Sequence, residues 1–239
     1  DLLVVGLAFE KGTDVAITPP SGWTLILRTN QSSNVGYATY RKVAGASEPA
    51  SYSFALTNSP KWSIGSCAIA GSDTTTPIDV HNDASGVSGN PSAPSVTTTG
   101  AKRLVLAFYA NKKPATLSNY TSPAVERWDA PNTSGGLPAN AMASYEQPVA
   151  GATGAKSATI SEQAEWVAQQ IAIAPGASVK RFLWDVNQGL PQLALERDAN
   201  NSPIRRYVYG ARRISQTAGS DTSYYLHDGR GSVANLTSS

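Results

Sequence analysis

The sequence predicts an all-β fold, with a jelly-roll-like antiparallel β-sandwich over residues 1–175 and a ladder of β-hairpins over residues 179–239. Three observations support this prediction. Roughly ten runs of about five to ten residues in the first region are continuously apolar or alternate apolar with polar side chains. Segments rich in Gly, Pro, Asn and Asp separate the runs, and no stretch of the chain has helical periodicity.

The first five expected strands cover residues 2–9, 23–28, 35–43, 51–56 and 62–70. The run at 2–9, LLVVGLAF, is almost continuously apolar, which indicates a central strand. Pro19-Pro20-Ser21-Gly22 is a strong chain break, and residues 29–34 form the turn between the second and third strands.

A long polar connection is expected at residues 71–94, and its length favours a jelly roll, whose packed sheets accommodate long crossovers. Asp73, Asp79, His81 and Asp83 raise the question of a metal site in this segment. Calcium, however, requires six to eight converging oxygen ligands, and the spacing is not that of an EF-hand loop. A turn-rich loop with aspartates in local hydrogen bonds is therefore preferred, and neither a metal nor a cofactor is predicted.

The remaining strands of the sandwich are expected at residues 95–99, 102–111, 120–128, 139–147, 155–160 and 165–174. In the second of these, Leu104, Leu106 and Phe108 share one face, as period-two alternation requires. Residues 176–178 follow as a short linker into the tail.

The tail consists of short period-two runs at 182–186, 190–197, 204–210 and 224–227, each ended by Asn, Asp or Gly. This pattern is typical of hairpins, because those residues tolerate the positive φ of tight turns. Hairpins this short cannot bury a core alone, so the tail needs a neighbouring sheet from its own chain or another. Its aromatic residues are the candidate anchors of an assembly interface: Trp184, Tyr207, Tyr209, Tyr224 and Tyr225.

The segment LWDVNQGLPQLALERDANNSPIRRYVYG, with YYLHDGRGSV after it, resembles the RHS/YD-repeat family, and the block from Asp228 to Val233 is the most specific part. Members of that family are large secreted or surface proteins whose repeats form long β-sheet spirals, some of which close into toxin-holding shells. Only two or three repeat units occur here, and the chain ends just after this block. The resemblance therefore implies extended β-structure and an extracellular setting, but neither encapsulation nor self-cleavage.

Residues 1–175 more loosely resemble a jelly-roll module of secreted bacterial and phage tail-associated proteins. The resemblance rests on ITPPSGWTLI, YRKVAGASEPASYSF and WVAQQIAIAP. Such modules are adhesive or structural parts. Residue 1 falls at the start of an expected strand, so the natural chain is expected to begin earlier.

Composition argues against several partners. Charged residues are only 15% of the chain and the net charge is +2, without the cluster of basic residues that nucleic-acid binding needs, so a nucleic-acid partner is not predicted. The arginine pairs at 205–206 and 212–213 are interpreted as solvated strand ends. No apolar run reaches the roughly 18 residues of a membrane helix, so membrane insertion is not predicted. Cys67 is the only cysteine, which excludes an intrachain disulfide and indicates a buried structural thiol.

No catalytic residues are predicted. The two histidines, His81 and His227, lie in a polar connection and before a turn, and no nucleophile-elbow, zinc-protease or phosphate-loop motif is present. Carboxylates that could act in pairs in glycoside chemistry are interpreted as solvated strand ends: Glu126, Glu146, Glu162 and Glu165.

A carbohydrate-binding module is the alternative, because Trp62, Tyr120 and Trp128 lie near expected loops and could stack on sugar rings. Core packing explains the same residues more simply. Several Asn-x-Ser/Thr triplets could carry glycans: Asn30, Asn119, Asn132, Asn200 and Asn235.

The predicted function is an extracellular structural subunit, a homo-oligomer or homopolymer that assembles by β-strand pairing into a surface fibre or sheath. The alternative is an adhesive module, with a surface glycan as partner, of a larger RHS-type surface or toxin-delivery protein.

Overall fold

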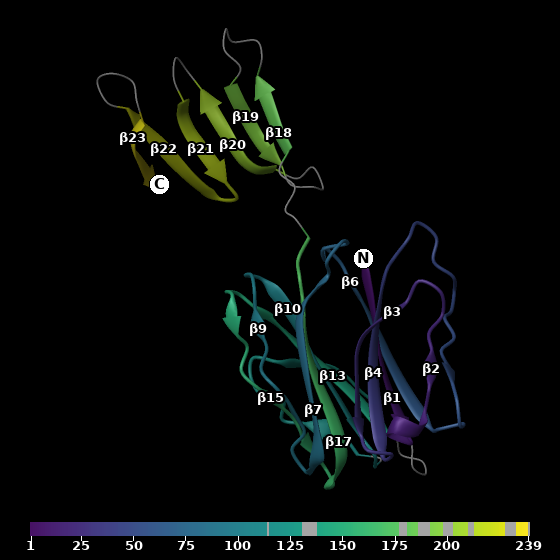
Figure 1. The fold of residues 1–239 in the computed structure, drawn as a ribbon. Coiled ribbons are helices and arrows are strands. Elements are labelled where there is room, and N and C mark those ends of the chain that lie inside the picture. The colour runs from purple at the N-terminus through teal and green to yellow at the C-terminus, as the bar shows by residue number, and fades with distance from the viewer. Residues whose placement is uncertain are drawn as a thin grey trace. The chain divides into compact units, whose positions relative to one another are not determined.

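The chain forms two compact units in the computed structural model, Asp1–Gly176 and Ala177–Ser239 (Figure 1). The structure describes every residue except 114, 131–137, 177–180, 186–191, 198–202, 210–212, 228–232 and 239. Within these described residues the only helix is a short 3-10 segment, η1 (Gly12–Asp14). No helix among them is long and apolar enough to cross a membrane.

The first unit contains two antiparallel sheets that face each other (Figure 1). One has the order β3-β4-β1-β6, with β3 (Thr24–Gln31), β4 (Val35–Val43), β1 (Leu2–Glu10) and β6 (Trp62–Ile69). The other has the order β12-β13-β10-β17-β7, with β12 (Val125–Ala130), β13 (Ala139–Gln147), β10 (Arg103–Asn111), β17 (Ala164–Ile173) and β7 (Ile78–Ser88). The predicted all-β antiparallel sandwich is confirmed. Each sheet comes from one continuous part of the chain, so the connectivity is simpler than the double Greek key of many jelly rolls.

Four two-stranded ladders lie outside these sheets. They are β2 (Ile17–Thr18) with β5 (Ala55–Leu56), β8 (Ser92–Ala93) with β15 (Lys156–Ser157), β9 (Thr97–Thr98) with β14 (Gly151–Ala152), and β11 (Leu117–Ser118) with β16 (Thr159–Ile160). The continuous strands expected at 51–56 and 95–99 are therefore mostly irregular chain, and the one expected at 120–128 begins only at Val125. The strand expected at 155–160 is divided at Ala158 into β15 and β16.

Apolar clusters lie on both faces of the central strands, which explains their continuous hydrophobicity. Between the sheets, Val4 of β1 and Phe108 of β10 belong to one cluster. On the opposite faces, Leu7 packs among residues of the β2–β5 region, and Tyr109 packs among residues of the β11–β16 region. The prediction that residues 2–9 form a central strand is confirmed.

The prediction of a long polar connection at residues 71–94 is wrong, because this segment contains the eleven-residue strand β7, which pairs along β17. β7 lies at the edge of its sheet, and His81 and Asn82 are exposed there. An edge strand has one accessible side, so it can keep polar side chains that resemble a loop in the sequence.

Two buried amides join the sheets. The Asn140 Oδ1 accepts hydrogen bonds from Tyr37 Oη (2.9 Å) and Trp128 Nε1 (3.3 Å), while its Nδ2 donates to the carbonyls of Gly6 (3.0 Å) and Ser63 (3.1 Å). Gln169 Nε2 donates to Thr29 Oγ1 on the opposite sheet at 2.9 Å. Because each amide is satisfied, these contacts fix how one sheet lies on the other.

The second unit is one six-stranded antiparallel meander, in which consecutive strands are neighbours (Figure 1). Its strands are β18 (Arg181–Asp185), β19 (Gln192–Arg197), β20 (Pro203–Tyr209), β21 (Arg213–Ala218), β22 (Asp221–His227) and β23 (Val233–Ser238). The turns expected at 187–189, 198–201 and 228–229 lie outside the described residues.

Candidate functional site

The strand β6 forms an edge of its sheet, and its outer side has no strand partner among the residues that the structure describes. It runs for eight residues beside β1 without a register shift. The Glu10 N–H donates to the Lys61 carbonyl at 2.9 Å, which sets the phase of the ladder. Backbone N–H and C=O groups point to opposite sides at successive residues of a strand. Those of Ser63, Gly65 and Cys67 therefore point towards β1, and those of Trp62, Ile64 and Ser66 point towards the open side.

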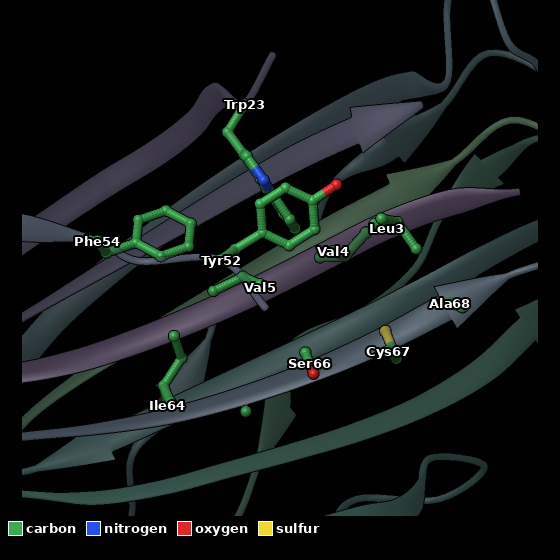
Figure 2. Close-up of a pocket in the computed structure, with 11 residues that line it drawn as sticks. Leu3, Val4, Val5, Trp23, Tyr52, Phe54, Ile64, Ser66, Cys67 and Ala68 are labelled. Atoms are coloured by element: carbon green, nitrogen blue, oxygen red, sulfur yellow. The ribbon is translucent and has the colours of Figure 1, made fainter. Parts of the chain in front are cut away.

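An apolar groove follows the same strand on the outer face of the sheet. Figure 2 shows the rings of Trp23, Tyr52 and Phe54 over β1, with Ile64 and Ser66 on the neighbouring β6. The main hollow has a volume of about 360 Å³, and a second of about 240 Å³ shares Tyr52, Phe54 and Ile64 with it. Together the hollows form a groove along β6.

The wall of the groove is held by packed aromatic rings. The Trp23 ring meets Tyr52 edge-on at 5.2 Å and Phe54 at 5.5 Å between centroids. Lys42 Nζ donates to the Tyr52 hydroxyl at 2.9 Å and pairs with Glu48, so it anchors the loop that carries the wall. A Trp buried against two rings has little rotational freedom, and the groove is therefore preformed.

The floor of the groove remains accessible where the wall ends. Trp62 is 51% exposed and Ile64 is 42% exposed, although both belong to a strand beside the core. The lining offers few polar groups, chiefly Ser53 and Ser66, while the Tyr52 hydroxyl is already bonded to Lys42. An extended segment with apolar side chains at alternate positions fits this surface, because it bonds the open backbone and fills the hollows together.

Cys67 lies next to the groove with its side chain on the inter-sheet face, in contact with the core cluster. Burial raises the pKa of its thiol to about 11. Since the thiolate is the reactive form, this cysteine acts as a small apolar residue, in agreement with its interpretation from the sequence.

The three candidate sugar-binding residues lie in different places. Trp62 borders the groove. The Trp128 ring packs on Phe108 at 6.1 Å between the sheets. The Tyr120 ring packs on Tyr109 at 5.8 Å, on the other side of the second sheet. The structure therefore does not bring them together as a platform.

The tail aromatic residues divide between the two faces of the meander. The Tyr225 hydroxyl donates to Gln216 at 2.7 Å and the Tyr207 hydroxyl bonds to Glu196, on one face. Tyr224 points to the other face and is 48% exposed. Trp184 lies in β18 and Tyr209 in β20, and their side chains are outside the described set.

The possible glycosylation sites are also placed unevenly. Asn119 is exposed, whereas Asn30 in β3 is half-buried and its Oδ1 accepts from Arg28 at 3.4 Å. Asn132 and Asn200 lie outside the described residues, and Asn235 lies in β23 with its side chain outside them.

Two of the residues considered for metal binding, Asp73 and Asp79, have structural contacts. The Asp79 carboxylate accepts from Arg103 Nε at 2.9 Å; burial opposes its ionisation, but bonds from Thr99 and Arg103 hold its pKa below the ordinary value. Asp73 accepts the backbone N–H groups of Thr75 and Thr76. No group of three or more His, Cys, Asp or Glu placed to hold a metal ion occurs in the described part of the chain.

The carboxylates considered for glycoside chemistry lie at the surface or near it. Glu162 pairs with Lys113 at 3.5 Å, both side chains being at least half exposed. Glu126 and Glu146 are exposed, and Glu165 is half-buried in β17. His227 lies in β22, with its side chain outside the described set.

The sequence interpretation missed Trp23, Tyr52, Phe54 and Ile64, which build most of the groove. The spacing of Tyr52 with Phe54, and of Trp62 with Ile64, was an available signal, since alternate apolar residues share one face of an extended chain. Searches of protein-family models, curated proteins and solved structures found no match to this chain.

Proposed function

We propose that this chain is an extracellular structural subunit that assembles by β-strand pairing into a surface fibre or sheath. The observation that carries the proposal is the open edge of β6, with Trp62 and Ile64 exposed beside an apolar groove. An edge strand of this kind is a template for a strand of another chain.

The proposed contact is strand addition. The incoming strand bonds to the open backbone groups of Trp62, Ile64 and Ser66, and its alternate side chains enter the groove. The tail offers strands for this role, because β18 and β23 are the edges of its sheet. A contact between two different surfaces repeats from subunit to subunit, and without closure it produces a filament.

The RHS/YD-repeat relationship and the extracellular location belong to the same proposal. The six-stranded meander, with consecutive strands joined as hairpins, supports them because it is the local architecture that the resemblance implies. The low content of charged residues, 15%, also suits a subunit whose surfaces become buried in an assembly.

Ser66→Pro tests the proposal directly. Ser66 faces Val5 at a position where its N–H points away from β1, so proline preserves the β1–β6 ladder but removes an edge donor. Ser66→Thr retains the donor and is the matched control. We expect the wild type and Ser66→Thr to elute as large oligomers in size-exclusion chromatography and to form fibres in negative stain. Ser66→Pro should elute no larger than a dimer and should form no fibre.

A chain that ends at Pro175 supplies the second arm, and it should remain monomeric while keeping the β-sheet circular dichroism spectrum of the sandwich. Monomeric wild-type protein at high concentration, or fibres of Ser66→Pro equal to those of the wild type, would refute assembly through this edge.

Carbohydrate binding is the second candidate function, favoured by the half-exposed Trp62 at the groove. Sugar sites need several convergent polar groups beside an aromatic ring, and few line this groove. A glycan array decides between the two: specific binding that Trp62→Ala abolishes would support the adhesive module.

A further inference from the structure

The two faces of the tail sheet differ sharply in chemistry. Cross-strand pairing places Glu196, Arg205, Tyr207, Gln216 and Tyr225 on one face. The Tyr207 hydroxyl bonds to Glu196, the Tyr225 hydroxyl to Gln216, and Arg205 lies 3.6 Å from the Glu196 carboxylate. Both tyrosine hydroxyls of this polar face therefore bond within the sheet, while the buried Nε of Arg205 has no hydrogen-bond partner among the described side chains and backbone groups.

The opposite face, here called the apolar face, carries the exposed hydrophobic side chains of the tail. The pairs Leu183 with Leu195, Val208 with Ser215 and Ser215 with Tyr224 place these residues on it, and Leu226 follows two residues after Tyr224. The exposed fractions are 54% for Leu183, 52% for Val208, and 48% each for Tyr224 and Leu226.

We propose that the apolar face binds the same face of a second copy of the chain, so that two tail sheets form a sandwich. A sheet that is hydrophobic on one face buries that face against another layer of secondary structure. The same face on each subunit gives a two-fold symmetric contact. This surface differs from the β6 edge, so the inference does not depend on the proposed function.

The area of the apolar face is large enough for a contact with a second copy of the chain. Strands of five to seven residues, spaced as in any sheet, give a face of roughly 20 by 25 Å. Two such faces in contact remove roughly 1,000 Å² from water, which reaches the lower bound for a specific interface.

The charge on the face also permits a self-contact. Among its described side chains there is no carboxylate. Its described cations are the half-buried Arg197 and the exposed Arg206, which lies in a row with Thr217 and Thr222. The flexible arginine stem packs along apolar surface, and its guanidinium can donate to hydroxyls of the facing sheet.

The experiment measures self-association in a Ser66→Pro background, in which strand addition at β6 is blocked. Sedimentation equilibrium from about 1 to about 100 µM should show a dimer, and Val208→Glu should weaken the dimer at least about tenfold. Val149→Glu is the matched control, because Val149 is 64% exposed and lies outside the strands. It should leave the dissociation constant unchanged.

Hydrogen exchange of the β20 to β22 amides separates a lost contact from a lost fold. If Val208→Glu removes their protection at low concentration, Leu226→Thr replaces it, because threonine keeps the strand preference and removes apolar surface. A monomer throughout the concentration range would overturn the inference. A dimer that neither Val208→Glu nor Leu226→Thr weakens would overturn it too. If Ser66→Pro and wild type form the same dimer and no fibre, only the β6 proposal fails.

Discussion

Replacing Asn140 by alanine should destabilise the sandwich and loosen the β6 edge. The amide makes four hydrogen bonds, to Tyr37, Trp128, Gly6 and Ser63, and is fully buried. Alanine leaves the Tyr37 hydroxyl and the Trp128 indole N–H without their acceptor, at a cost of about 1–3 kcal/mol each. The two carbonyls keep their ladder partners, so we expect a total loss of about 3–5 kcal/mol.

Urea denaturation followed by tryptophan fluorescence measures this loss, since Trp128 itself borders the site. With a slope of about 2 kcal/mol per molar urea, the midpoint should fall by roughly 2 M. Hydrogen exchange should also show faster opening of β6, because Asn140 bonds to the Ser63 carbonyl in that strand.

Asn111→Ala is the matched control. Asn111 is as fully buried as Asn140, yet neither of its side-chain polar atoms has a partner among the described residues. Its replacement removes similar volume and none of these bonds, so the loss should be much smaller. A loss for Asn111→Ala equal to that of Asn140→Ala would show that volume, rather than hydrogen bonding, determines the effect.

Three further changes test other contacts of the sandwich. Gly65→Ala should cost about 1–3 kcal/mol in urea denaturation, because its methyl group would lie 2.3 Å from the Trp128 ring; an unchanged midpoint would contradict the packing. Asp79→Asn should lower the melting temperature at neutral pH, because the folded state lowers the pKa of Asp79 and the ionised carboxylate therefore stabilises the fold above the ordinary pKa of about 3.9. This contribution is lost as the pH falls through the folded pKa, so the difference in melting temperature between wild type and Asp79→Asn should vanish in acid. The Cys67 thiol, with a pKa of about 11, should react slowly with a thiol reagent at pH 8 and rapidly in urea, and fast native labelling would refute its burial.

The central strands could be predicted from the sequence because burial on both faces leaves a local signal. Residues 2–9 are almost continuously apolar, and so is β10 from Leu104 to Ala110, while β17 is apolar apart from Glu165 and its two buried glutamines. β7 has no such signal, since an edge strand can carry His81 and Asp83 without burying them. The two-residue ladders depend on contacts between distant segments, such as β8 with β15, and no local pattern specifies them.

The groove could be predicted only in part. The sequence offers Trp62 as a possible sugar-stacking residue and favours core packing for it, whereas its side chain is half exposed. The wall forms only when Tyr52 meets Trp23 across the chain. Trp128 gave no signal that distinguishes a ligand platform from packing, because a tryptophan on a short strand is compatible with either. Its place in the core depends on Asn140 and on the absence of a side chain at Gly65.

The sandwich has four edge strands, and β6 differs from the other three. β3 carries Arg28 and a register irregularity, and it packs against β7, which carries Asp79 and Asp83. β12 is short, contains an irregularity and carries Glu126 and the arginine that follows it. Charges, bulges and shortness are the features by which proteins prevent unwanted pairing at sheet edges.

β6 has none of these protections in the described structure. It is eight residues long, regular in register, free of charged residues between Trp62 and Ile69, and it exposes Trp62 and Ile64. A chain that protects three edges and leaves the fourth both open and apolar loses solubility at that strand unless a partner covers it. The proposed edge contact would join two different surfaces and extend a line of subunits, whereas the proposed tail contact would join identical surfaces and pair them. The two contacts together would therefore produce a fibre made of two lines of subunits, which a two-fold axis relates to each other.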